Sequence, residues 1–80
     1  MISKMDATAP TVLWRLRNGR GAEARAVLIP GEPHATLTIL VDEVMDRAEN
    51  FDSLDMALFR AEDLRATLVA DGWRDEPAHP

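Results

Sequence analysis

The sequence predicts a small α+β domain, an antiparallel β-meander of three to four strands with one C-terminal α-helix packed on one face. Three observations carry this prediction. Apolar residues alternate with polar ones along residues 11–41, which is typical of half-buried strands. Turn-forming residues divide that region at short intervals. From residue 53 onward the apolar residues recur with the spacing of an amphipathic helix.

Composition limits the classes of protein to which the chain can belong. It has 80 residues, 46% of them apolar, and a net charge of −5, so it is neither a disordered chain nor a basic one. No apolar run reaches the roughly 18 residues of a membrane span, and residues 1–10 lack the apolar centre of a secretory signal. The absence of cysteine excludes disulfides and thiolate metal sites and fits a cytoplasmic protein.

The chain divides into three parts. Residues 1–10 predict a flexible N-terminal lead-in that ends at Pro10. Residues 11–74 hold all the periodic segments and predict a single α+β domain. Residues 75–80 are polar and rich in proline, which predicts a flexible tail.

The first two strands are predicted at Thr11–Arg17 and Glu23–Ile29, joined through the turn-forming pair Asn18-Gly19. Two registers are open. A two-residue loop pairs Trp14 with Arg25, whereas a three-residue loop with Gly19 in the left-handed conformation pairs Trp14 with an alanine. Burial favours the second register, because a slip of one residue turns every side chain to the wrong face.

The third strand is predicted at Ala35–Val41, with Leu37 and Ile39 facing the helix. Asp42-Glu43 then turns the chain without a glycine. Residues 44–51 predict a fourth strand at the edge of the sheet, although their apolar side chains are poorly sorted between the two faces. A single bent third strand is the alternative.

A helix is predicted from about Ser53 to Asp71. Asp52 or Ser53 can cap its N-terminus, and Gly72 is a natural stop after which Trp73 can pack back on the last turn. One apolar stripe follows the helical spacing, formed by Leu54, Ala57, Leu58, Ala61, Leu64, Leu68 and Val69. The predicted core combines strand and helix residues: Trp14, Leu16, Leu28, Leu37, Ile39, Val41, Leu58, Leu64 and Leu68.

A longer pattern of packing and turn residues covers most of residues 11–74. It consists of Trp14-x-Leu16, Asn18-Gly19, Ala26-x-Leu28-x-Pro30, Val41-Asp42, Phe51, Ala57, Ala61-Glu62, Leu64-Arg65, Leu68 and Gly72-Trp73. This pattern resembles that of small uncharacterised hypothetical proteins from bacterial genomes. The resemblance implies a β-meander with a C-terminal helix and implies no activity.

No group of residues predicts catalysis. Nucleophilic catalysis requires a base held beside the nucleophile, yet the two histidines, His34 and His79, lie at a turn and in the tail. Gly19-x-Gly21 falls in a hairpin instead of a strand-to-helix loop, so it does not predict a phosphate site. We therefore expect a non-enzymatic protein without metal or cofactor.

The leading functional hypothesis is a protein-interaction module. A single helix covers only one side of a sheet, so aliphatic and arginine side chains are expected to gather on the other side, which suits a protein interface and most simply a homodimer. The candidate residues are Leu13, Arg15, Arg17, Arg25, Val27, Ile29 and Leu40. Met56 and Phe59 lie off the main helical stripe and form a secondary candidate, either covered by the tail or in contact with a partner.

Two alternatives use charge. The acidic stretch of residues 42–55 either protects an edge strand from pairing or faces a partner, in which case the chain is a small acidic inhibitor or adaptor of a basic, nucleic-acid-binding protein. Its acidic residues are Asp42, Glu43, Asp46, Glu49, Asp52 and Asp55. The remoter alternative is an accessory nucleic-acid binder that uses Arg15, Arg17 and Arg25, which the net negative charge opposes. No membrane partner is expected.

Overall fold

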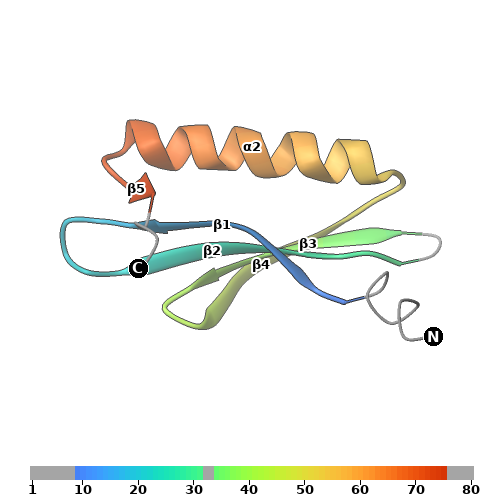
Figure 1. The fold of residues 1–80 in the computed structure, drawn as a ribbon, viewed down its shortest axis with the longest axis horizontal. Coiled ribbons are helices and arrows are strands. Elements are labelled where there is room, and N and C mark those ends of the chain that lie inside the picture. The colour runs from blue at the N-terminus through green and yellow to red at the C-terminus, as the bar shows by residue number, and fades with distance from the viewer. Residues whose placement is uncertain (1–8, 32–33, 76–80) are drawn as a thin grey trace, which may run out of the picture.

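The computed structural model describes residues 9–31 and 34–75. Within these ranges the chain forms one antiparallel sheet of five strands in the order β4-β3-β2-β1-β5, and one helix, α2, that lies over one face of the sheet (Figure 1). The elements are β1 (Thr11–Arg17), β2 (Glu23–Ile29), β3 (Ala35–Val41), β4 (Val44–Phe51), α2 (Leu54–Ala70) and β5 (Arg74–Asp75). The predicted α+β class, the meander and its four strands are thus confirmed. The predicted features of residues 1–8 and 76–80 lie outside the described ranges.

The hairpin between β1 and β2 has the predicted register, in which Trp14 lies opposite Ala26. Asn18 N donates to the carbonyl of Ala22 at 3.1 Å, and Gly21 N donates to the carbonyl of Asn18 at 3.1 Å, so three residues form the loop. The left-handed residue is Gly21, at φ 85°, and not Gly19. In a three-residue loop of this kind the last loop position carries the positive φ, which corrects the prediction.

A β-bulge interrupts β1 at Leu13, where the pairing shifts between Val12 and Trp14. The extra residue breaks the alternation of faces. Leu13 consequently packs against the buried core. Val12, opposite Val27, lies on the face away from the helix. The sequence prediction placed Leu13 on the side away from the helix, because alternation alone cannot reveal an inserted residue.

A two-residue turn at Asp42-Glu43 separates β3 from β4, so the alternative of one bent strand is wrong. Both residues have positive φ, 53° and 70°, which is the geometry of the tight hairpin turns that glycine and asparagine prefer. Two hydrogen bonds to Glu23 of β2 hold the turn: Asp42 N donates to the Glu23 carbonyl at 2.8 Å, and Glu23 N donates to Asp42 Oδ1 at 2.9 Å.

A second bulge, on β4 at Asp46, explains why the side chains of residues 44–51 looked poorly sorted. Leu40 lies opposite Met45, whereas Ile39 lies opposite Arg47. Directly opposed residues on neighbouring strands point to the same face. Beyond the bulge, Arg47, Glu49 and Phe51 therefore face the helix side, and Ala48 and Asn50 face away from it together with Met45.

Local signals set both ends of α2, as predicted. Ser53 is the N-cap, and its Oγ accepts a hydrogen bond from Met56 N at 3.2 Å. Gly72, at φ 105°, ends the helix. Gly72 N donates to the Val69 carbonyl and Trp73 N donates to the Leu68 carbonyl, the pair of bonds that defines a Schellman cap. Trp73 packs back on the core, also as predicted.

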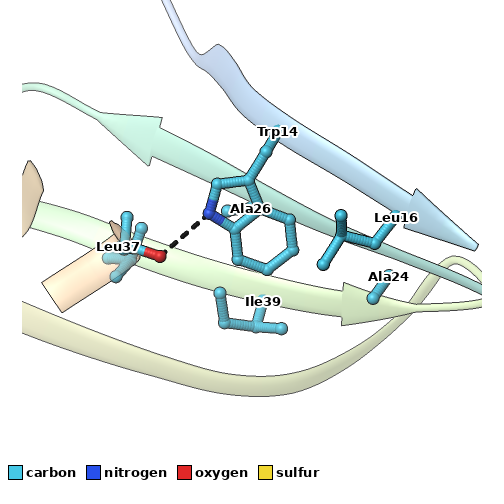
Figure 2. Close-up of a cluster of buried hydrophobic side chains, with 7 residues drawn as sticks. Trp14, Leu16, Ala24, Ala26, Leu37 and Ile39 are labelled. Atoms are coloured by element: carbon cyan, nitrogen blue, oxygen red, sulfur yellow. Dashed lines mark hydrogen bonds between the residues drawn. The ribbon is translucent and has the colours of Figure 1, made fainter. Parts of the chain in front are cut away.

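Small residues bring the helix close to the sheet. Ala57 and Ala61 are its only fully buried residues, and they face a sheet layer that includes Ala24, Ala26 and Ala35. Trp14 lies in this layer, and Figure 2 shows its indole beside Ala26 and Ile39 with its hydrogen bond drawn as a dashed line. The helix therefore meets the sheet along Ala57, Ala61, Leu64 and Leu68. Leu58, which the sequence assigned to the core, lies to one side of this line and is 40% exposed.

The rest of the predicted core agrees with the structure. Trp14, Leu16, Leu28, Leu37 and Ile39 are buried, and Val41, Leu64 and Leu68 are partly buried against them. The short β5, which the sequence did not predict, pairs with the end of β1, and Asp75 accepts a hydrogen bond from Arg65 of the helix. Asp75 thus belongs to the domain, not to the predicted tail. Within the described ranges, α2 is too short and too polar to cross a membrane.

Candidate interaction surface

One face of the sheet has no described element over it; we call it the open face. Figure 1 shows α2 on the opposite side, running roughly along the strands. The pairing of the strands identifies the residues that the open face carries: Val12, Arg15, Arg17, Glu23, Arg25, Val27, Ile29, Thr36, Thr38, Leu40, Met45, Ala48 and Asn50. Six of the seven predicted interface residues are among them, and Leu13 is the exception.

Uncharged side chains form a continuous band on the open face. One row runs across four strands as Val12, Val27, Thr38 and Ala48. The next row toward the Pro30 end is Ile29, Thr36 and Asn50, in which Thr36 Oγ1 hydrogen-bonds Asn50 Oδ1 at 2.8 Å. The row on the other side begins with Arg15 and Arg25 and ends with Leu40 and Met45. Charge is therefore confined to one corner of this face.

Sequence reasoning missed two large apolar members of the band, Val12 and Met45, which are 42% and 60% exposed. Val12 lies beyond the bulge at Leu13 and so departs from simple alternation, whereas Met45 precedes the bulge at Asp46 and therefore lies on the opposite face from Phe51. The one signal in the sequence was the poor sorting of apolar residues in the fourth strand. A bulge in β4 resolves that pattern, but the pattern alone does not say where the extra residue lies.

The arginines of the open face mostly have acidic neighbours within the molecule. Arg25 Nη2 lies 2.7 Å from Glu43 Oε1, and Arg17 Nη2 lies 3.9 Å from Glu23 Oε2. Arg15 is exposed beside Arg25. Readers of single-stranded nucleic acid present aromatic side chains on such a face, whereas Trp14 and Trp73 both pack against the core. This arrangement gives the nucleic-acid hypothesis no support.

The acidic stretch does not form one patch. The Asp42 carboxylate accepts a hydrogen bond from Glu23 N, and Glu43 pairs with Arg25. Asp46 is 3.6 Å from Arg47, Glu49 is 3.2 Å from Arg60, and Asp52 is 3.4 Å from His34. Asp55 lies in the first turn of α2. Most of these carboxylates are thus spread over different surfaces and already have a basic neighbour, which weakens the hypothesis that residues 42–55 bind a basic protein as one unit.

The secondary candidates, Met56 and Phe59, are exposed on the helix. Phe59 is 77% exposed and Met56 is 59% exposed. Together with Phe51 they line a groove whose other walls are Asp55 and Arg60. Arg60 donates hydrogen bonds to Glu49 and Asp63 across and along this groove, and the Glu49 carboxylate raises the pKa of the guanidinium above its ordinary value.

An apolar cavity of about 170 Å³ lies at the other end of the helix. It opens between the last turns of α2 and the sheet, because large side chains stand around the small Ala24. Its apolar lining includes Trp14, Ile39, Val41, Leu64, Leu68 and Trp73, with Asp46, Arg47 and Thr67 also lining it. The cavity explains why Leu64 and Leu68 are only partly buried.

The described residues offer no group of three or more histidine or carboxylate side chains that could hold a metal ion. His34 is exposed and lies next to Asp52, and nothing in these contacts places a nucleophile beside it. Comparison of the chain with protein-family models, with curated proteins and with solved structures finds no match. The resemblance to small bacterial hypothetical proteins therefore stays a prediction.

Proposed function

We propose that this chain is a non-enzymatic protein-interaction module that forms a homodimer through the open face of its sheet. The observation that supports this proposal best is the uncharged band across β1 to β4, with arginine at its margin. Interfaces typically lack charge at their centre and carry arginine and aliphatic residues. A cytoplasmic location belongs to the same proposal, since the chain has no cysteine.

A second copy is the partner that best fits the small core of this domain. Of the ten buried apolar residues in the described ranges, five are alanine: Ala24, Ala26, Ala35, Ala57 and Ala61. Small domains bury a modest fraction of their apolar surface and often gain stability by association. Two open faces packed together would form a four-layer sandwich with a second core between the sheets.

The charges of the open face are complementary under a two-fold axis. The basic residues Arg15 and Arg17 lie on β1, and Glu43 lies in the β3–β4 turn. An axis that runs along the strands between β2 and β3 lays β1 of one copy over β4 of the other. This arrangement brings Arg15 toward Glu43 of the second copy twice, as the symmetry of an isologous interface requires.

Analytical ultracentrifugation tests the proposal. We expect a dimer in the micromolar range that persists at high salt, because the band is uncharged. Val27→Asp is expected to give a monomer, since it places an unpaired carboxylate in the interface. Ala48→Asp, on the exposed edge strand of the same row, should act alike with less risk to folding. The matched control is Val44→Asp on β4, whose residue 44 lies opposite Val41 on the helix side.

The arrangement of the two copies has its own test. Arg15→Glu and Glu43→Lys should each weaken the dimer, because each places two like charges opposite each other. The double variant should restore the dimer, because it exchanges the two charges and keeps them opposite in sign. A wild-type monomer at high micromolar concentration overturns the proposal. A dimer that survives both Val27→Asp and Ala48→Asp assigns self-association to a different surface.

A further inference from the structure

The first two turns of α2 are apolar on nearly all sides, and the sheet covers only one of these sides. Among residues 54–61, six of eight are apolar and only Asp55 and Arg60 are charged. The sheet buries Ala57 and Ala61, whereas Leu54, Met56, Leu58 and Phe59 are all exposed. A helix segment that is apolar all round is normally covered all round. The second half of the helix, with Glu62, Asp63, Arg65 and Thr67, has the ordinary polar outer side.

The exposed apolar side chains form a shaped surface on the β4 side of the helix. Met56 and Phe59 are three residues apart and so lie side by side along α2. Phe51, from the end of β4, forms the opposite wall, and together they line a groove of about 490 Å³. This volume falls within the roughly 300–1,000 Å³ of sites that accommodate organic groups. The groove can therefore receive two or more apolar side chains of a partner.

The charge around the groove is negative. Glu49, Asp55 and Asp63 contribute three carboxylates against the two guanidinium groups of Arg60 and Arg47, the latter 3.9 Å from Glu49, a net charge of −1. Arg60 is engaged by two of those carboxylates, Glu49 and Asp63, each at 3.2 Å. A second copy of this chain would bring the same negative groove, which like charges oppose. The complementary occupant is a partner that carries positive charge beside its apolar residues.

The geometry favours a helical partner over a strand. An extended partner would add to the free edge of β4, but that edge has a bulge and the charged residues Asp46, Arg47 and Glu49, which are features that hinder strand pairing. The ridge of Met56 and Phe59 follows the helix, and such ridges pack against the grooves of another helix. We infer that the groove of Phe51, Met56 and Phe59 binds a basic amphipathic helix of another protein.

This interaction is separate from dimerisation, since the groove and the open face lie on opposite sides of the sheet. The probe is a synthetic peptide of leucine and lysine, about 18 residues or five helical turns long, with leucine at helical spacing. It is compared with a peptide of the same composition in scrambled order and with a leucine–glutamate peptide of the same spacing. Binding is followed by NMR titration of the labelled full chain, both wild type and Val27→Asp.

We expect amide shift changes centred on Phe51 and residues 54–63, equal in wild type and Val27→Asp. Phe59→Ser should weaken binding roughly tenfold, as the loss of a central aromatic anchor does. The double variant Asp55→Asn, Asp63→Asn should weaken binding less and reduce its dependence on salt. Val44→Ser is the matched control, because Val44 is also an exposed apolar residue, 68% exposed, but lies outside the groove. Since Phe59 is so exposed, its variant is expected to keep the wild-type fold.

Several results would overturn the inference. The inference is wrong if the shift changes centre on the open face. It is also wrong if the scrambled or the acidic peptide binds equally well, or if no binding is seen at millimolar peptide. Concentration-dependent shifts of the groove without peptide would assign it to a second copy. Protection of the groove by phosphatidylcholine vesicles would assign it to lipid. Loss of the dimer in Val27→Asp with unchanged peptide binding separates this inference from the proposed function.

Discussion

The indole Nε1 of Trp14 donates a hydrogen bond to the backbone carbonyl of Ala61 at 2.9 Å, across the layer between the sheet and the helix (Figure 2). This bond joins β1 to the middle of α2, 47 residues later in the chain. It satisfies the one polar atom of a buried tryptophan, at a point where the helix presents the small, buried side chain of Ala61 to the sheet. Trp14 therefore fixes the height of the helix above the sheet.

Trp14→Phe should reduce the free energy of unfolding by about 1–3 kcal/mol. The change removes the donor to Ala61 and leaves a small void where the indole lay. Urea unfolding followed by circular dichroism measures the loss. Trp73→Phe is the control, because Trp73 is only partly buried and its side chain lines the cavity. A larger loss for Trp73→Phe than for Trp14→Phe would contradict this account of the core.

Leu16 and Leu58 test which leucines belong to the core. Leu16 is fully buried, and Leu16→Ala should cost about 2–5 kcal/mol of unfolding free energy. Leu58 is 40% exposed on the flank of α2, so Leu58→Ala should cost less than about 1 kcal/mol. Alanine is compatible with the backbone at both positions, so the difference between the two losses of unfolding free energy reports side-chain burial. Similar losses at the two positions would show that the helix is rotated relative to the arrangement described above.

The turn at Asp42-Glu43 is a site where stability can be gained. Glu43 adopts φ 70° with a side chain that prefers negative φ, and Glu43→Gly relieves this cost. The variant also loses the ion pair with Arg25, which is worth little because the Glu43 side chain is 66% exposed. Glu43→Gln removes the charge and keeps the backbone strain, so it is the reference.

We expect Glu43→Gly to be about 1 kcal/mol more stable than Glu43→Gln in thermal or urea unfolding. Asp42 is left unchanged in both variants, since its carboxylate accepts the hydrogen bond from Glu23 N. Equal stability of the two variants would mean that the turn carries no strain at residue 43.

Much of this fold was determined by local sequence. The four strands from Thr11 to Phe51 begin and end where alternation and turn residues predict, because both signals act over a few neighbouring residues. The helix is bounded by Ser53 and Gly72 for the same reason, since capping satisfies backbone groups within one turn. The pairing of Trp14 with an alanine also followed from sequence, because only that register buries the apolar side chains of both strands.

Tertiary structure decided which side of the sheet several residues occupy. The bulges at Leu13 and Asp46 depend on how a strand fits its neighbour, and each exchanges the faces of the residues beside it. Val12 thereby joined the open face and Leu13 left it, and the shift at Asp46 puts Ala48 and Asn50 on the open face with Met45. The two-residue β5 has too little sequence to be recognised, and it forms because the Schellman turn after α2 returns the chain to β1.

The rotation of α2 was likewise a tertiary outcome. The helical stripe in the sequence is broad enough to include Leu54 and Leu58, and periodicity alone does not say which of its residues lie closest to the sheet. Close approach requires small side chains, so Ala57 and Ala61 took the contact line and the larger leucines moved to its flank. Sequence thus determined the elements, whereas the steric fit between helix and sheet decided which apolar residues remain exposed to meet a partner.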